Sequence, residues 1–179
     1  MAESDQKKAL RERYRRERRE RFMDHNFLNL VNTPEIQSAH TIGSYYSIND
    51  EPSTFALNLE LIKQGKRILL PSISGQELLW RVWDGSSLEL SKKIPEARGE
   101  IVEVSECDAL LVPALRVDRR GFRLGQGGGY FDRALVSAQC WTCALVHPDE
   151  ISSQDLPTDE WDIAVRAFAT PHMVTRIRG

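Results

Sequence analysis

The sequence predicts a single α/β domain, a three-layer sandwich whose central sheet is mostly parallel. The length of 179 residues, 41% of them hydrophobic, suits one domain with a buried core and a ligand cleft. Two short apolar runs, residues 66–71 and 108–113, have the length and composition of buried strands. A glycine cluster separates the second run from a helical pattern and a third apolar run, and this strand, loop, helix and strand order is typical of α/β folds.

Residues 1–25 are predicted to form a basic N-terminal helix. Charged side chains occupy nearly every position from residue 7 onward, and Leu10, Tyr14 and Phe22 are the large apolar anchors. This spacing favours a helix that contacts the body along a narrow apolar stripe. The first 21 residues hold nine Lys or Arg and five acids, although the whole chain has a formal net charge of −2. The protein is therefore not a polycation built to coat nucleic acid, but the helix alone could be a solvated arm that touches RNA or DNA.

The next elements are short. Residues 40–46 are the best strand candidate between residues 33 and 53. The sequence Glu-Pro-Ser-Thr at residues 51–54 indicates a helix start, and the helix that follows should bury one face formed by Phe55, Leu59 and Ile62.

Gly65 stands where the C-terminal cap of this helix is expected. The strand at residues 66–71 should end at its proline, because proline cannot donate a hydrogen bond to a neighbouring strand. Residues 77–83 and the polar connector 84–103 show no clear periodicity.

The last predicted elements follow the glycine cluster. Residues 141–146 indicate a third buried strand. Residues 130–139 indicate a helix with one apolar face, formed by Phe131, Ala134, Leu135 and Ala138.

The chain has no apolar run of the roughly 18 residues that a membrane helix needs, and no apolar region follows its basic start. We therefore expect a soluble, cytoplasmic protein. Three cysteines do not make a disulfide framework and are expected to be free thiols. Cys140 and Cys143 have the spacing of a metal or redox pair, but only Cys107 remains as a further thiol, which disfavours a metal site.

Residues 121–133, Gly-Phe-Arg-Leu-Gly-Gln-Gly-Gly-Gly-Tyr-Phe-Asp-Arg, are the most informative segment. A glycine in an ordered segment costs about 1 kcal/mol relative to alanine, so the cluster needs a backbone reason. Bare N–H groups at a helix start can bind phosphate oxygens, and Arg123 and Arg133 add positive charge. Asp132 offers a hard oxygen ligand for Mg²⁺. A flexible surface loop remains the alternative.

The known phosphate loops do not match this segment. The dinucleotide fingerprint and the protein-kinase loop need a third glycine where this chain has Tyr130. A Walker A loop needs Gly-Lys-Ser or Gly-Lys-Thr at its end. Residues 111–133 instead resemble the signature of the 5-formyltetrahydrofolate cyclo-ligase family, also called methenyltetrahydrofolate synthetase. Further segments resemble family elements in the same order, so that the resemblance covers nearly the whole chain: residues 7–11, 51–54, 65–71 and 156–162.

The resemblance implies an enzyme that cyclises 5-formyltetrahydrofolate to 5,10-methenyltetrahydrofolate with ATP and Mg²⁺, releasing ADP and phosphate. The ATP-binding residues that it implies are Lys7, Lys8, Arg11, Arg123, Leu124, Gly125, Gln126, Gly127, Gly128, Gly129, Tyr130 and Phe131. Folate would be bound by Tyr46, Glu51, Gln126, Gly127, Gly128, Gly129 and Tyr130. Arg123 and Tyr130 would be catalytic, and Asp132 and Asp162 would bind Mg²⁺.

Simpler roles stay open for some of these residues. Glu51 is also a helix N-terminal acid favoured by the helix dipole, Tyr46 could be core packing, and Asp162 could be an ordinary surface acid. The chain departs from the family at Gln126, where an aromatic is common, and at residues 94–98. Altered specificity or a non-catalytic nucleotide- or folate-binding homologue is therefore the alternative function. We expect a monomer that binds ATP and reduced folate, with neither membrane nor nucleic acid as a partner.

Overall fold

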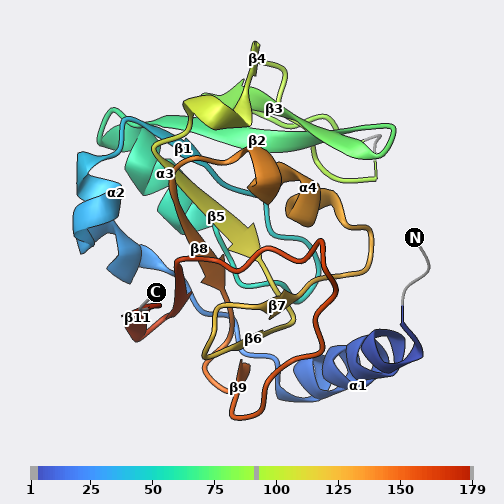
Figure 1. Ribbon diagram of the computed structural model, residues 1–179. Helices are drawn as coiled ribbons and strands as arrows, with labels where there is room; N and C mark the ends of the chain where they lie inside the picture. Colours follow the sequence, from blue (N-terminus) through green and yellow to red (C-terminus); the bar gives the residue numbers. More distant parts are fainter. Residues whose placement is uncertain (1–3, 91–92, 178–179) are drawn as a thin grey trace.

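The computed structural model describes residues 4–90 and 93–177 and confirms the α/β fold with a mostly parallel sheet (Figure 1). The predicted domain (1–179) and the predicted helix (1–25) both include residues 1–3, which lie outside the described residues. The main sheet has the strand order β11-β10-β8-β5-β1-β2-β3-β4. Its five parallel strands are β1 (Thr41–Gly43), β2 (Arg67–Ser74), β5 (Ala109–Pro113), β8 (Trp141–Leu145) and β10 (Ala167–Thr170).

Antiparallel strands complete both edges of the main sheet. They are β3 (Glu77–Trp83) and β4 (Ile101–Val102) at one edge and β11 (Met173–Arg176) at the other. A second, three-stranded sheet has the order β7-β6-β9 and consists of β6 (Arg116–Asp118), β7 (Arg123–Leu124) and β9 (Ile151–Ser152).

The main sheet is covered on both faces, as the apolar runs predict. In β5, Ala109 and Leu111 belong to one core cluster and Leu110 and Val112 to the other, because successive side chains of a strand point to opposite faces. The first cluster is covered by η1 (Leu28–Asn32), α2 (Pro34–Ser38) and α3 (Phe55–Lys63), and the second by η2 (Val104–Glu106) and α4 (Tyr130–Ser137). Each fully buried leucine contributes about 1.5–3 kcal/mol of transfer free energy.

The predicted unit of strand, glycine loop, helix and strand is present. In the sequence β5 precedes α4 and β8 follows it, and the two strands pair in parallel. Ala134 and Leu135 of α4 are buried, and Phe131 and Ala138 pack against the same cluster, as expected. The short antiparallel pair of β6 and β7 between β5 and the loop was not predicted. Because of this pair, the glycine loop follows a strand of the small sheet and not a strand of the main sheet.

The prediction that the strand at residues 66–71 ends at Pro71 is wrong, because β2 continues to Ser74. The carbonyl of Leu69 accepts the Ser44 N–H on the side of β1, so the nitrogen of Pro71, two residues later, faces the same side. There β1 has already ended at Gly43, and no donor is missed.

The predicted buried face of α3 is wrong by part of a turn. Phe55 is 46% exposed, whereas Leu57, Asn58 and Leu61 are fully buried. Leu59 and Ile62 are only partly buried and pack against the margin of the core. Asn58 can be buried because its amide donates to the Tyr45 carbonyl and its side-chain oxygen accepts from the Ser44 hydroxyl.

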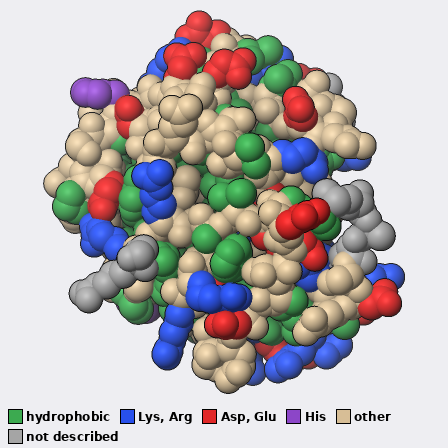
Figure 2. Space-filling model, in the orientation of Figure 1, with side chains coloured by type: hydrophobic (Ala, Val, Ile, Leu, Met, Phe, Trp, Pro, Cys, Tyr) green, Lys and Arg blue, Asp and Glu red, His purple; other side chains and the backbone are tan. Residues whose placement is uncertain are grey.

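The helix α1 (Asp5–Arg21) lies apart from the main sheet, beside the small sheet (Figure 1). It ends at Arg21, before the predicted end at residue 25. Leu10 and Tyr14 of the predicted apolar stripe are half-buried, whereas Phe22 is 42% exposed, and the fully buried side chains of the helix are Lys7 and Arg18. Lys and Arg side chains gather over α1 at the lower right of Figure 2. In the part of the chain that the structure describes, no helix is long and apolar enough to cross a membrane.

Candidate functional site

A cavity of about 530 Å³ lies beyond the carboxyl ends of β2 and β5, where α/β folds bind their ligands. This volume is typical of small-molecule sites. Figure 2 shows an apolar patch in the centre of this face with charged side chains around it. The cavity wall includes the glycine loop, the start of α4 and one face of α1.

The glycine loop joins β7 to α4 and lines one half of the cavity. We call this half the ionic half, because it also contains the charged side chains Lys7, Arg11, Arg123, Asp132, Asp159 and Asp162. Gly129 has a φ of 67°, a left-handed backbone conformation that favours glycine, and a Cβ there would lie 2.7 Å from Nη1 at the end of the Arg133 side chain. The residue is the N-cap of α4, and no side chain caps the helix. The first N–H groups of α4 therefore remain available to an anion in the cavity.

Arg123 lies under the loop with its side chain 3% exposed. Its Nη2 atom forms an ion pair with Asp132 Oδ1 at 2.8 Å. Its Nε atom is buried and has no hydrogen-bond partner among the described residues. Burial lowers the pKa of the guanidinium, although the nearby carboxylate of Asp132 opposes this shift. A buried cation with an unused donor fits the binding of a phosphate oxygen.

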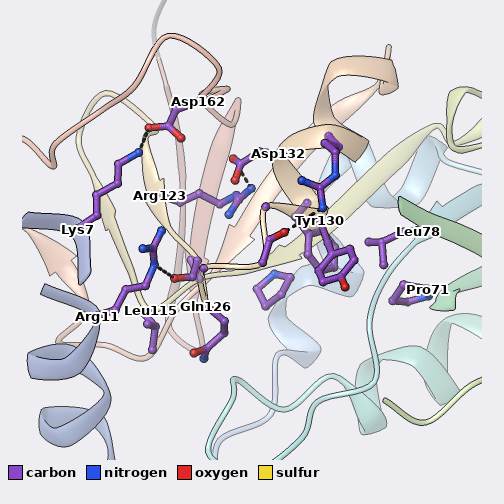
Figure 3. Close-up of a pocket in the computed structure, with 18 of the residues that line it drawn as sticks. Lys7, Arg11, Pro71, Leu78, Leu115, Arg123, Gln126, Tyr130, Asp132 and Asp162 are labelled. Carbon is purple, nitrogen blue, oxygen red and sulfur yellow. Dashed lines mark hydrogen bonds and ion pairs between the residues drawn. The ribbon is translucent and has the colours of Figure 1, made fainter. Parts of the chain in front are cut away.

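Helix α1 supplies the opposite ionic wall. Lys7 Nζ forms ion pairs with Asp159 and Asp162, and Arg11 Nε donates to the Gly125 carbonyl at 2.7 Å. Burial opposes the charge of Lys7, but the hydrogen bonds with the two aspartates outweigh it and raise the pKa of Lys7. Figure 3 shows Lys7 and Arg11 side by side, with Lys7 directed to Asp162 and Arg123 extending from the same region toward Asp132.

Asp132 and Asp162, the predicted Mg²⁺ ligands, both line the cavity. Mg²⁺ in phosphate-transfer sites is usually held by one or two carboxylates together with phosphate oxygens and water. Two carboxylates beside a phosphate-binding loop therefore fit a magnesium–ATP complex. They do not form a cage made only of protein, and within residues 4–90 and 93–177 no group of three or more potential ligands is arranged to hold a metal.

The other half of the cavity is apolar. Its lining comes mainly from β2, β3 and the following connector, and includes Pro71, Ile73, Leu78 and Ile94. Tyr130 lies between this half and the loop (Figure 3), and its hydroxyl is 3.5 Å from the Gly75 carbonyl. Such a surface can pack against a flat heterocycle.

Glu51 lies in the same cavity and offers a carboxylate. Its Oε2 atom accepts the Ile48 N–H at 3.0 Å. Burial raises the pKa of Glu51, and the Ile48 hydrogen bond and the charge of Arg18 only partly offset this shift.

Three residues of the predicted site lie elsewhere. Tyr46 packs against Phe55 and Trp83, with ring centroids 6.0 and 6.3 Å away, which fits its alternative role in packing. Lys8 is exposed and Leu124 is buried, and neither is among the residues that line the cavity.

Both departures from the family pattern have structural partners. Arg15 of α1 donates to the side chain of Gln126 at 2.8 Å and to its carbonyl at 2.6 Å. Ile94 lines the cavity, and Glu96 of the same segment accepts the Ile73 N–H at 3.1 Å. The segment 94–98 is thereby tied to β2.

Sequence reasoning missed Arg18, Asp159 and Trp161, which also line the cavity. A signal for Arg18 was present, because Lys7, Arg11 and Arg18 fall on one helical face. Asp159 and Trp161 lie in an irregular segment, where no periodicity predicts which side chains point inward.

The fold and the cavity define an α/β protein with a glycine loop and basic side chains next to an apolar cleft. The chain belongs to the 5-formyltetrahydrofolate cyclo-ligase family, whose model matches residues 3–171. It is 32% identical over 156 residues to the 5-formyltetrahydrofolate cyclo-ligase of Escherichia coli K12, a match covering 81% of this chain and 85% of that protein. It is 33% identical over 146 residues to that of Mycolicibacterium smegmatis, covering 75% of each chain. The predicted family is therefore confirmed.

Solved structures agree with this assignment. The NMR structure of Aquifex aeolicus 5,10-methenyltetrahydrofolate synthetase has a TM-score of 0.80 and 29% identity, with 97% of this chain and 93% of that chain covered. A 5,10-methenyltetrahydrofolate synthetase from Mycoplasma pneumoniae shares the fold, with a TM-score of 0.72 and 21% identity over 92% of this chain and 98% of that one.

Proposed function

We propose that this protein cyclises 5-formyltetrahydrofolate to 5,10-methenyltetrahydrofolate and converts ATP to ADP and phosphate in the same reaction. The observation that carries the proposal is that the ionic half, with the glycine loop, and the apolar half, with Glu51, belong to one cavity. A shared cavity lets the γ-phosphoryl group of ATP meet the formyl oxygen of the folate without diffusion between sites.

The ATP phosphates bind between the glycine loop and α1. The N–H groups at the start of α4 and the side chains of Lys7, Arg11 and Arg123 surround this space, so the negative charge of the phosphates is matched from two sides. Asp132 and Asp162 would hold Mg²⁺, which supplies charge neutralisation for the leaving ADP.

The folate binds in the apolar half, with its ring packed near Tyr130 and its polar edge toward Glu51. A carboxylate accepts hydrogen bonds from the amino and ring N–H groups of the pteridine. Arg123 and Tyr130 lie where the two substrates meet and are the proposed catalytic residues.

The chemistry has two steps. The formyl oxygen attacks the γ-phosphorus and ADP leaves, which gives a phosphorylated imine-type intermediate. The nitrogen at position 10 then attacks the former formyl carbon and the ring closes. Phosphate leaves with the electron pair of the broken carbon–oxygen bond, and the proton of the nitrogen passes to the phosphate. The protein has to align a weak nucleophile with the phosphoryl group and stabilise the charge that develops on its oxygens, which is the work of Arg123 and the loop N–H groups.

The test is an absorbance assay for methenyltetrahydrofolate with purified protein, 5-formyltetrahydrofolate, Mg²⁺ and ATP. We expect product only when ATP and Mg²⁺ are both present. Binding of both substrates by calorimetry without turnover would replace the proposal with the non-catalytic homologue. The cytoplasmic location and the monomeric state stay predictions, and size-exclusion chromatography with light scattering checks the second.

A further inference from the structure

Arg18 is a buried cation in the wall of the cavity, far along α1 from Lys7. Its side chain is 1% exposed. Nε and Nη2 form a bidentate pair with Glu150 at 2.7 and 2.6 Å, and Nη2 also donates to the Ala114 carbonyl. Arg18 lines the cavity together with Ile48 and Glu51, but Glu150 does not. The guanidinium therefore stands between a fixed carboxylate behind it and the open cavity.

Part of the guanidinium remains available. Arginine has five N–H donors, and the bonds to Glu150 and Ala114 use only those on Nε and Nη2. No hydrogen bond joins Nη1 to another of the described residues. Glu51 is in a similar position, because Ile48 donates to its Oε2 atom and no donor among these residues contacts Oε1. The cavity wall thus offers an unused donor and an unused acceptor.

The segment that carries Glu51 is connected to the partner of Arg18 through His147. The Nε2 atom of His147 lies 2.9 Å from the Asp50 carbonyl oxygen, and the His147 N–H donates to Glu150 Oε2 at 2.8 Å. The positive charge of Arg18 is also among the interactions that offset the rise that burial causes in the pKa of Glu51.

We infer that Arg18 and Glu51 together bind the pyrimidinone edge of the folate ring, a specificity role for Arg18 that rests on the proposed function. This edge carries the 2-amino group and the N3–H, which are donors, and the C4 carbonyl oxygen, which is an acceptor. Glu51 accepts from the two donors, and Arg18 Nη1 donates to the C4 oxygen. A carboxylate alone would leave that oxygen buried without a donor, which typically costs 1–3 kcal/mol.

The geometry of α1 separates this role from ATP binding. Arg18 follows Lys7 by eleven residues, or about 16 Å along a helix axis, and follows Arg11 by seven, or about 10 Å. The phosphates near Lys7 and Arg11 therefore lie at one end of the helix and the pyrimidinone edge at the other. The formyl group falls between them, on the side of the ring that faces the glycine loop.

Arg116 provides a matched control for a purely structural role. It also attaches α1, through Glu17 at 2.7 Å and by lying 4.0 Å from the ring centroid of Tyr14, but it does not line the cavity. Weaker docking of α1 should affect ATP, because α1 carries Lys7 and Arg11. Loss of a folate contact should instead weaken folate binding more than ATP binding.

The experiment compares the wild type with Arg18→Met/Glu150→Gln, which removes both charges of the buried pair, and with Arg116→Met. Calorimetry measures the Kd of ATP, of 5-formyltetrahydrofolate, and of its 4-amino analogue, in which an amino donor replaces the C4 oxygen and N3 carries no proton. We expect the wild type to prefer the 4-oxo ligand by about tenfold or more. The double variant should prefer it by less than about threefold and should lose far more affinity for folate than for ATP. Arg116→Met should keep the preference.

A structural role alone would not change the ratio of two ligands that differ only at C4 and in the proton on N3. The inference is overturned if the wild type binds both ligands equally, or if the double variant keeps the full preference. Should the double variant fail to unfold cooperatively, Arg18→Leu/Glu150→Leu replaces the buried pair with apolar side chains and also removes the donor, and a wild-type preference in that variant contradicts the inference. Turnover by a wild type that shows no preference would leave the proposed function standing, whereas the absence of folate binding would overturn both.

Discussion

Lys7 and Asp162 are 155 residues apart in the sequence and form an ion pair in the wall of the cavity. A second ion pair, Arg123 with Asp132, lies in the same wall. Two cations proposed for phosphate binding are thus paired with the two carboxylates proposed for Mg²⁺. A magnesium–ATP complex would supply a new partner to each of the four groups. Binding is then an exchange of partners, which limits the desolvation cost of bringing more charge into the cavity.

Substitution of Lys7 by methionine should weaken ATP binding and leave folate binding nearly unchanged. A hydrogen bond to a charged group contributes about 1.5–3 kcal/mol, so the KM for ATP should rise about 10- to 100-fold. Steady-state kinetics with each substrate varied in turn measure this. Arg19→Met on the exposed side of α1 is the control and should change neither KM. Equal loss of affinity for both substrates would contradict the placement of ATP at Lys7.

Asp132→Asn keeps the shape of the side chain and removes its charge. We expect magnesium-dependent turnover to fall by about a hundredfold or more, because a metal-bound carboxylate is replaced by a neutral amide. Calorimetry should show that added Mg²⁺ no longer tightens ATP binding. Thermal unfolding should stay cooperative, and Asp24→Asn, an exposed position, should behave as the wild type. Near-normal activity in Asp132→Asn would remove that residue from the metal site.

Gly129→Ala should damage both the fold and the loop. The position has a φ of 67°, which costs an alanine about 1 kcal/mol, and the new methyl group would press on Arg133. Gly65→Ala is the control, because Gly65 has a φ of 82° and nothing within 4 Å of the added Cβ. Urea unfolding should show that both variants are destabilised. The KM for ATP should rise only in Gly129→Ala; a similar rise in Gly65→Ala would mean that strain alone affects the site.

The raised pKa of Glu51 predicts a pH-dependent cost to stability. Burial raises this pKa above 4.5, so the folded state holds the proton more tightly than the unfolded state does. Stability from this group is therefore lost as the pH rises from about 4.5 through the folded pKa, and stays lost at pH 7. Glu51→Gln should be more stable than the wild type at pH 7, and the difference should shrink at pH 4.

Urea unfolding at the two pH values measures this effect, with the exposed Glu12→Gln as control. A wild type that is more stable than Glu51→Gln at pH 7 would contradict the assignment. The same variant should bind 5-formyltetrahydrofolate about tenfold or more weakly, because a neutral amide is a poorer acceptor for the pteridine N–H groups.

The sequence predicts the sheet and the loop well, because both depend on local patterns. Buried parallel strands such as β5 are continuous apolar runs, and the glycines before α4 have no common structural use other than a tight turn or close approach to a ligand. Pro71 was misleading because its effect depends on whether a neighbouring strand is still present, which is a property of the whole sheet.

The pairing of charges was beyond sequence reasoning for the same reason. The helical face that Arg18 shares with Lys7 and Arg11 is the one local signal for it. Its burial follows from Glu150 and the Ala114 carbonyl, which lie more than ninety residues away in the sequence. The prediction that Phe55 is buried was wrong for a different reason. The apolar spacing correctly predicted a helix, but Asn58 is buried and Phe55 is exposed, because the Tyr45 carbonyl and the Ser44 hydroxyl form hydrogen bonds with the side-chain amide of Asn58.

The two parts of this molecule are held by different forces. Neither apolar core cluster contains a side chain from α1, which is attached by ion pairs and hydrogen bonds through Lys7, Arg11 and Arg18. The body is therefore stabilised mainly by hydrophobic burial, while its first helix is attached through side chains that we propose also bind the substrates. Substitutions in that helix can therefore change the affinity for the nucleotide while the stability of the two core clusters changes little.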